Sequence, residues 1–152
     1  MLGMSLEQPR TEDAVIERWN HLFEVLSAEP RRQLVVTLMD SDPNEWVPLP
    51  MAAQSPAVPI DADALALELH HRHLPMLEDG EFIDWTREPF EATRGDRFEE
   101  LSAVLASLHR NADTLPLQLV EGCYRLEYER DRERERAQES ERERAQESER
   151  EW

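Results

Sequence analysis

The sequence predicts a mainly α-helical domain with one small β-hairpin, continued by a charged C-terminal tail that is helical or disordered. Apolar residues recur every three or four positions in several segments, which is typical of helices with one buried face. Two short segments alternate apolar and polar residues, as half-buried strands do. These patterns predict a flexible N-terminus, a compact domain, a helical extension and the tail, at residues 1–10, 11–110, 111–128 and 129–152.

The first helix is predicted to follow Thr11, whose hydroxyl can cap a backbone N–H of the first turn. Glu12 and Asp13 then lie where negative charge favours the helix dipole. Five apolar residues share one face and predict a buried stripe, namely Ile16, Trp19, Leu22, Phe23 and Leu26.

Ser27 is predicted to end the first helix and to cap a second one. Pro30 lies in the first turn of that second helix, where a missing N–H is tolerated. Its apolar face consists of Leu34, Val35, Leu38 and Met39. Residues 46–49 predict a short edge strand, because the prolines in and after this segment exclude a central one. Residues 51–53 predict a single helical turn.

The clearest helix start in the sequence is at Asp61, a good N-cap residue. This helix is expected to run to about Leu77 and to end at Gly80. Pro75 removes one internal hydrogen bond and is expected to kink or tighten the last turn.

Residues 81–85 and 90–93 predict the two strands of a β-hairpin, and Asp96 is expected to cap a further helix. The apolar residues of that helix are spaced three, four and three apart, which is typical of two helices that pack on each other. They predict a homodimer interface formed by Phe98, Leu101, Leu105 and Leu108.

The tail contains the octet RERAQESE twice, at residues 134–141 and 142–149. Ion pairs between residues three apart, such as Glu139 with Arg142, favour a helix by a few tenths of a kcal/mol each. An eight-residue period matches no coiled-coil repeat. The repeat therefore predicts a solvated, fraying helix or disorder, with a coiled coil as the alternative.

The composition is strongly acidic, with 34 acidic and 17 basic residues and a net charge of −17; every basic residue is arginine. This pattern predicts a halophilic protein, because at about 1 M salt the Debye length falls to roughly 3 Å and self-repulsion is screened. The single Cys123 fits a reducing compartment. No apolar run is long enough to span a membrane and no signal peptide is evident, so a cytoplasmic location is predicted.

The order of the predicted elements (helix, helix, short strand, helical turn, long helix, hairpin, helix) is that of a winged helix-turn-helix. The chain also resembles a family, the ArsR-like winged-helix proteins of halophilic archaea, many of which are domains of unknown function. The residues that carry the resemblance are LSAEPRR at 26–32, LHHRHLPML at 69–77, then Gly80 and FIDW at 82–85, and TRGDRFEEL at 93–101. The resemblance covers roughly residues 12–110 and implies a transcriptional regulator that binds double-stranded DNA.

In such a fold the helix from Asp61 would enter the major groove and the hairpin would form the wing. Glu68 could accept a hydrogen bond from cytosine, and His71 and Arg72 could meet phosphate or a guanine edge. Phosphate contacts are also expected from Arg31, Arg32, Arg87 and Arg94. The leading half of the helix is acidic, so a second interpretation stays open, a winged-helix protein-interaction module without DNA binding.

The remaining chemistry in the sequence is sparse. His70 and His73 share one helix face and could hold a metal, but no spacing supplies further ligands, so partly buried histidines are the preferred interpretation. No nucleophile with a base, glycine-rich phosphate loop or carboxylate pair is present in a recognisable context. We therefore predict no enzymatic activity, metal or cofactor.

Overall fold

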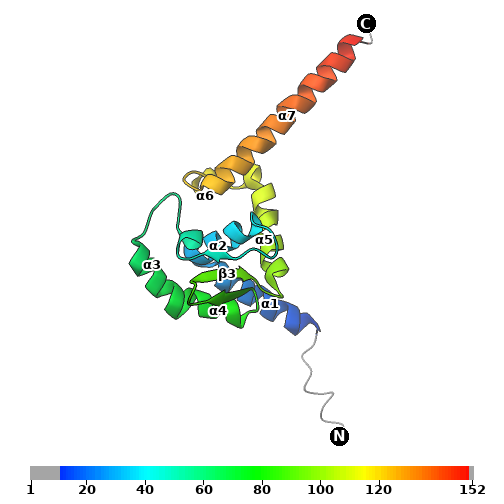
Figure 1. Cartoon of the computed structure of the whole chain (residues 1–152). Coiled ribbons are helices and arrows are strands. Elements are labelled where there is room, and N and C mark those ends of the chain that lie inside the picture. The colour runs from blue at the N-terminus through cyan, green and yellow to red at the C-terminus, as the bar shows by residue number, and fades with distance from the viewer. Residues whose placement is uncertain (1–10, 151–152) are drawn as a thin grey trace, which may run out of the picture. The chain divides into compact units, whose positions relative to one another are not determined.

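The structure is a computed structural model that describes residues 11–150 (Figure 1). The chain forms two compact units. The first consists of the residues up to Ser55 and Pro59–Ser102, and the second of Pro56–Val58 and the residues from Ala103 onward. The division therefore falls within the helix α5 (Phe98–Arg110), whereas the sequence placed the end of the domain at residue 110.

The first unit opens with the helices α1 (Thr11–Leu26) and α2 (Glu29–Met39). The helix α2 follows Ala28 and carries a proline in its first turn. Ser27 ends α1 as predicted, with its hydroxyl donating to the Glu24 carbonyl at 2.6 Å, but it does not cap α2, whose N-cap residue is Ala28. Three residues of the predicted apolar face of α2, Leu34, Val35 and Leu38, are fully buried, and the fourth, Met39, is half-buried.

The apolar stripe predicted for α1 is only partly buried. Leu22 and Leu26 lie in the core, together with Val25. Three other members of the stripe face solvent, with exposed fractions of 57% for Ile16, 46% for Trp19 and 62% for Phe23. The prediction that they are buried is wrong: within the described residues only the C-terminal part of α1 contributes to the core.

A three-stranded antiparallel sheet completes this part of the fold. Its strands are β1 (Val47–Pro48), β2 (Ile83–Thr86) and β3 (Glu91–Arg94). The strand order is β1-β3-β2, so the predicted hairpin is confirmed and the predicted segment at 46–49 forms the edge strand. Ala92 in β3 pairs with Val47 in β1 on one side and with Trp85 in β2 on the other. This register fixes the hairpin against the rest of the first unit. One 3₁₀ turn, η2 (Met51–Ala53), follows β1 as predicted.

The predicted helix from Asp61 is present but has an irregular centre. It consists of α3 (Ala62–Glu68), the π-helical turn η3 (Leu69–His73) and α4 (Leu74–Asp79). The Asp61 carboxylate caps it by accepting a hydrogen bond from the Ala64 N–H at 3.1 Å. The Leu74 N–H donates to the Leu69 carbonyl, five residues back. Of the two effects predicted for Pro75, a kink or a tightened turn, the second is wrong: the proline follows a widened turn, which relieves the clash of its ring with a preceding carbonyl.

The second unit contains the end of α5 and three further elements. They are η4 (Ala112–Thr114), α6 (Leu117–Val120) and α7 (Tyr124–Arg150). The tail is thus helical as far as Arg150 and is continuous with the extension that precedes it (Figure 1). Ion pairs link Arg125 with Glu129 at 3.4 Å and Arg136 with Glu133 at 2.8 Å, the spacings at which such pairs support a helix.

Candidate nucleic-acid interface

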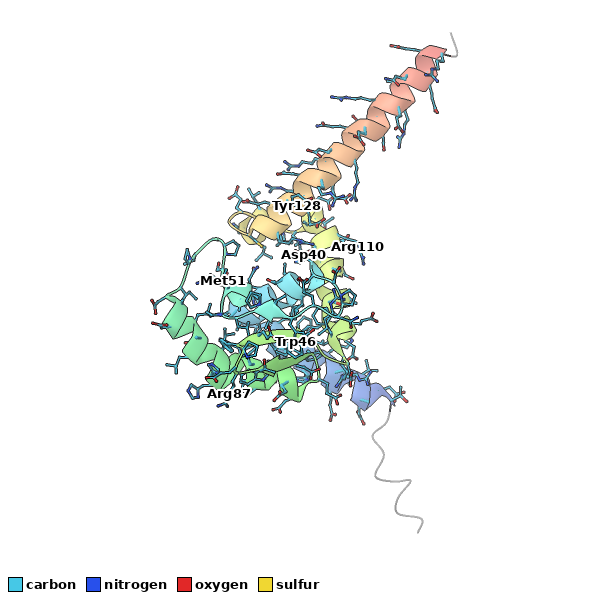
Figure 2. All side chains as sticks on the ribbon, in the orientation of Figure 1. Asp40, Trp46, Met51, Arg87, Arg110 and Tyr128 are labelled. Carbon is cyan, nitrogen blue, oxygen red and sulfur yellow. The ribbon has the colours of Figure 1, made fainter. Side chains whose placement is uncertain are left out.

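The hairpin rests on the π-helical turn through an aromatic cluster. The His70 ring stacks on Phe90 with centroids 4.3 Å apart and 8° between the planes. The Trp85 ring meets His70 edge-on at 5.6 Å, and the Arg87 guanidinium lies 5.7 Å from the Trp85 centroid. Arg87 lies at the surface of the first unit (Figure 2). Arg72 is exposed two residues after His70. The contacts of His70 with Trp85 and Phe90 therefore join η3, which carries Arg72, to the hairpin, which carries Arg87.

Four of the seven residues predicted to contact DNA are exposed to solvent. They are Glu68, His71, Arg72 and Arg87. Asp61 and Asp63 are exposed at the start of the same helix, and Glu68 and Glu88 are exposed beside the two arginines, so this surface alternates positive and negative side chains. Arg72 and Arg87 are exposed, so a phosphate could approach both guanidinium groups from solvent.

Arg31 is buried, which corrects its predicted role as a phosphate ligand. Its exposed fraction is 1%. The guanidinium donates to the Val25 carbonyl at 2.6 Å, the Glu24 carbonyl at 3.1 Å and the Ser27 hydroxyl at 3.2 Å. These acceptors lie at the C-terminal end of α1, where the dipole favours a cation. Burial and then the nearby Arg72 charge lower the pKa of Arg31.

Arg32 and Arg94 are also used within the first unit. Arg32 donates to the Leu26 carbonyl at 2.6 Å and is half-buried. Arg94 donates to the Leu38 carbonyl at 2.8 Å and the Ser41 carbonyl at 2.9 Å. Two helix ends are therefore capped by arginine: α1 by Arg31 and Arg32, and α2 by Arg94. Arg31 is thus corrected to a structural role, whereas Arg32 and Arg94 are half-exposed and use only part of their donors in this way, so their phosphate contacts stay predictions.

His73 connects this interior network to the exposed helix. It is 2% exposed, and its Nδ1 lies 2.8 Å from Nη1 of Arg31. Because the guanidinium can only donate, Nδ1 accepts and the proton of the neutral ring is on Nε2. Nε2 lies 3.5 Å from the Glu68 carboxylate, longer than a well-formed hydrogen bond. Burial, followed by the Arg31 charge, lowers the pKa of His73, and Glu68 only partly opposes this shift.

Acidification is expected to destabilise the fold through His73. Its folded-state pKa lies below the unfolded value of 6.5. The unfolded chain therefore binds this proton first, so the free energy of unfolding is constant above that value and falls as pH decreases towards the folded pKa. Urea midpoints in molar salt at about pH 7.5 and about pH 5.5 measure the effect.

The matched variants are His73→Gln, which keeps an acceptor for Arg31, and His71→Gln at an exposed position. We expect the pH dependence to be weaker in the first variant and unchanged in the second. Equal pH dependence in His73→Gln and the wild type would contradict this assignment.

The predicted α5 dimer interface is not available on the surface. Phe98, Leu101 and Leu105 have exposed fractions of 2%, 0% and 4%, so they are already covered by their own chain. Only Leu108 is exposed, at 46%. Phe98 lies under the Arg94 guanidinium, with 4.9 Å between the guanidinium carbon and the ring centroid. The 3-4-3 spacing therefore reflects packing within the chain. The prediction that these residues form a homodimer interface is corrected.

Metal binding and membrane spanning each require a recognisable arrangement of residues. Within residues 11–150, no three His, Cys, Asp or Glu side chains are grouped as a metal ion would require. In the same range, no helix combines the length and the apolar composition needed to cross a membrane.

Sequence reasoning missed the contribution of Trp85 and Phe90 to this surface. Both were assigned only to the strands of the hairpin. An aromatic residue on each strand, together with a histidine in the preceding helix, was the available signal, because such rings commonly pack together. Their contact with His70 depends on the π-helical turn, which the sequence did not predict.

Comparison with known proteins identifies no relative: no family model, curated protein or solved structure matches this chain.

Proposed function

We propose that this chain is a DNA-binding transcriptional regulator of the winged-helix type that acts in molar salt. The observation that carries the proposal is the contact of the β2–β3 hairpin with the π-helical turn through His70 and Phe90. It supports a common surface for a helix with exposed His71 and Arg72 and a hairpin turn with exposed Arg87. The strand order β1-β3-β2 after two helices agrees with a winged helix-turn-helix.

The small number of exposed arginines fits DNA binding at high salt. Affinity falls with salt in proportion to the number of phosphates neutralised, with a log–log slope of about −0.9 per contact. A surface that uses mainly Arg72 and Arg87 therefore loses less affinity in molar salt than a strongly basic one. The acidic start of α3 would contribute selectivity, since carboxylates accept from the cytosine amino group in the major groove.

Reversing the charge of both arginines is expected to abolish DNA binding. The test is genome-wide crosslinking and immunoprecipitation of the tagged protein from halophilic cells kept in their native salt. The wild type is expected to give sharp peaks with a shared short motif, and Arg72→Glu/Arg87→Glu to give a flat profile.

The matched control is Arg18→Glu/Arg110→Glu, which changes the net charge equally at exposed sites elsewhere. It is expected to retain the peaks. Peaks that persist in Arg72→Glu/Arg87→Glu would place the interface elsewhere, and a flat profile from folded wild type would contradict DNA binding.

A protein-interaction module is the second candidate function. It is favoured by the inward use of Arg31, Arg32 and Arg94, which leaves the exposed side of α3 acidic. A cationic partner would then bind at Asp61 and Asp63. Charge reversal at those two residues would abolish this interaction, whereas Arg72→Glu/Arg87→Glu would leave it intact.

A further inference from the structure

The helix α3 carries a large apolar side chain on its outward side, Leu67, which is 60% exposed. Two residues before and after it, Leu65 and Leu69 are buried, with exposed fractions of 1% and 0%. Each residue of a helix is rotated by about 100° from the one before it, so Leu67 lies about 160° around the axis from both buried leucines. It therefore points away from the core. Asp63 and Ala64, one turn earlier, are exposed on either side of it.

We propose that Leu67 contacts the 5-methyl group of a thymine and gives the binding site a preference for this base. This contact depends on the proposed function, in which the helix that begins after Asp61 lies in the major groove. A side chain that points away from the core, in the middle of such a helix, faces the edges of the bases. The major groove presents one apolar group there, the thymine methyl, whereas the other groups that distinguish the bases are hydrogen-bond donors or acceptors.

The surroundings of Leu67 favour thymine over the other bases. Ala64 adds an exposed methyl group to the same side of α3. The neighbouring Glu68 carboxylate is turned towards η3, where its Oε2 lies 3.5 Å from Nε2 of His73. A polar base edge placed against Leu67 would lose its hydrogen bonds with water and gain none from the leucine, which is unfavourable. The thymine methyl has no hydrogen bond to lose, so it is the group that fits this position.

Molar salt increases the relative weight of this contact. The Debye length at about 1 M salt is roughly 3 Å, so the phosphate contacts proposed for Arg72 and Arg87 are weakened. Burying an apolar group involves no charge and is not screened in this way. The contact between Leu67 and thymine therefore contributes a larger share of the binding free energy in molar salt than in dilute buffer.

Deoxyuridine substitution tests the contact, because uracil pairs as thymine does but lacks the 5-methyl group. The probe is a duplex that carries the motif shared by the wild-type crosslinking peaks, with its thymines replaced one at a time. Its affinity is measured by fluorescence anisotropy in molar salt. At one position or more, the substitution is expected to weaken wild-type binding about four-fold, the effect of one buried methyl group. A motif without thymine would overturn the proposal.

Three variants assign the effect to Leu67. Leu67→Ala is expected to bind the unmodified duplex more weakly than the wild type and to be insensitive to the deoxyuridine substitution. Leu67→Met keeps a large apolar side chain and is expected to retain the response. The matched control Leu117→Ala shortens another exposed leucine, 56% exposed and in the second unit, and is expected to respond as the wild type does. Both sites lie outside the core, so circular dichroism should show folded protein in each case.

Failure of the thymine contact is distinguishable from failure of DNA binding. If the wild type binds the duplex and no deoxyuridine substitution changes its affinity, Leu67 does not contact a thymine methyl, although DNA binding stands. The same conclusion holds if Leu67→Ala responds to the substitution as strongly as the wild type. A flat crosslinking profile from folded wild type would contradict the proposed function itself and overturn the thymine contact with it.

Discussion

Replacing Arg31 with methionine is expected to lower the free energy of unfolding by about 3–5 kcal/mol. Methionine keeps the apolar part of the side chain but removes every N–H donor. The Val25 carbonyl and the Nδ1 atom of His73 then lose this donor, whereas the Glu24 carbonyl keeps its hydrogen bonds from the Ser27 N–H and hydroxyl. Buried acceptors left without a donor cost about 1–3 kcal/mol each, so these two together account for about 2–6 kcal/mol, which brackets the expected loss.

The matched control for Arg31 is the same substitution at Arg18. The Arg18 side chain is 61% exposed and forms an ion pair with Glu100 at 3.1 Å. Exposed pairs contribute about 0–1 kcal/mol, so Arg18→Met should change stability little. Denaturant unfolding in molar salt gives both values. Similar small losses in the two variants would contradict the structural role of Arg31.

Arg31→Lys separates the charge from the geometry of the hydrogen bonds. Lysine keeps the positive charge near the end of α1 but lacks the planar fork that reaches several acceptors at once. We expect a loss of stability between that of the wild type and that of Arg31→Met. A wild-type value would mean that the charge alone stabilises the end of α1.

Features with a local cause were predictable from the sequence. Asp61 was identified as a helix cap because an aspartate before a helical apolar pattern can accept a hydrogen bond from a backbone N–H of the first turn. In the structure its carboxylate accepts from the Ala64 N–H. The hairpin followed from alternation on both sides of a turn. Prolines marked the edge strand because they cannot donate to a central one. In each case the signal and the structure lie within a few residues of each other.

Features with a distant cause were not predictable in the same way. An arginine in the first turn of a helix looks the same whether it faces solvent or reaches the end of the preceding helix. Arg31 does the latter and also contacts His73, which lies 42 residues away in the sequence. Arg94 reaches the end of α2, 56 residues away. Of the arginines predicted at the site, only Arg72 and Arg87 stayed exposed.

Periodicity also does not identify what covers an apolar face. The α1 and α5 patterns both indicated one apolar side. Leu101 proved to be buried within its own chain, whereas Trp19 remained exposed. The burial of both helices thus differs from the expectation, because helical spacing is the same for a face covered by the chain and for one that is exposed. Only the coordinates of the neighbouring elements distinguish the two cases.

Replacing Gly95 with alanine is expected to cost about 3 kcal/mol through a steric conflict with the backbone. A Cβ atom there would lie 2.5 Å from the Glu81 carbonyl oxygen and 2.8 Å from the Ile83 nitrogen. Neither atom can move away as a flexible side chain could. The Gly95 N–H also donates to the Phe82 carbonyl at 2.9 Å, so the added methyl group would weaken this bond as well.

Gly122→Ala provides the contrast, because its added methyl group meets nothing within 4 Å and the φ of 86° is the only obstacle. That left-handed conformation costs alanine about 1–2 kcal/mol, and Gly122→Asn should cost less, since asparagine tolerates it. Thermal and urea unfolding of the three variants separate the two mechanisms. If Gly95→Ala were no more costly than Gly122→Ala, the close approach at Gly95 would not limit the fold. A larger loss for Gly95→Ala than for Gly122→Ala would mean that the close approach of Gly95 to Ile83 fixes the start of β2. Because Trp85 lies in the same strand, this approach would also set the position of the hairpin beside His70.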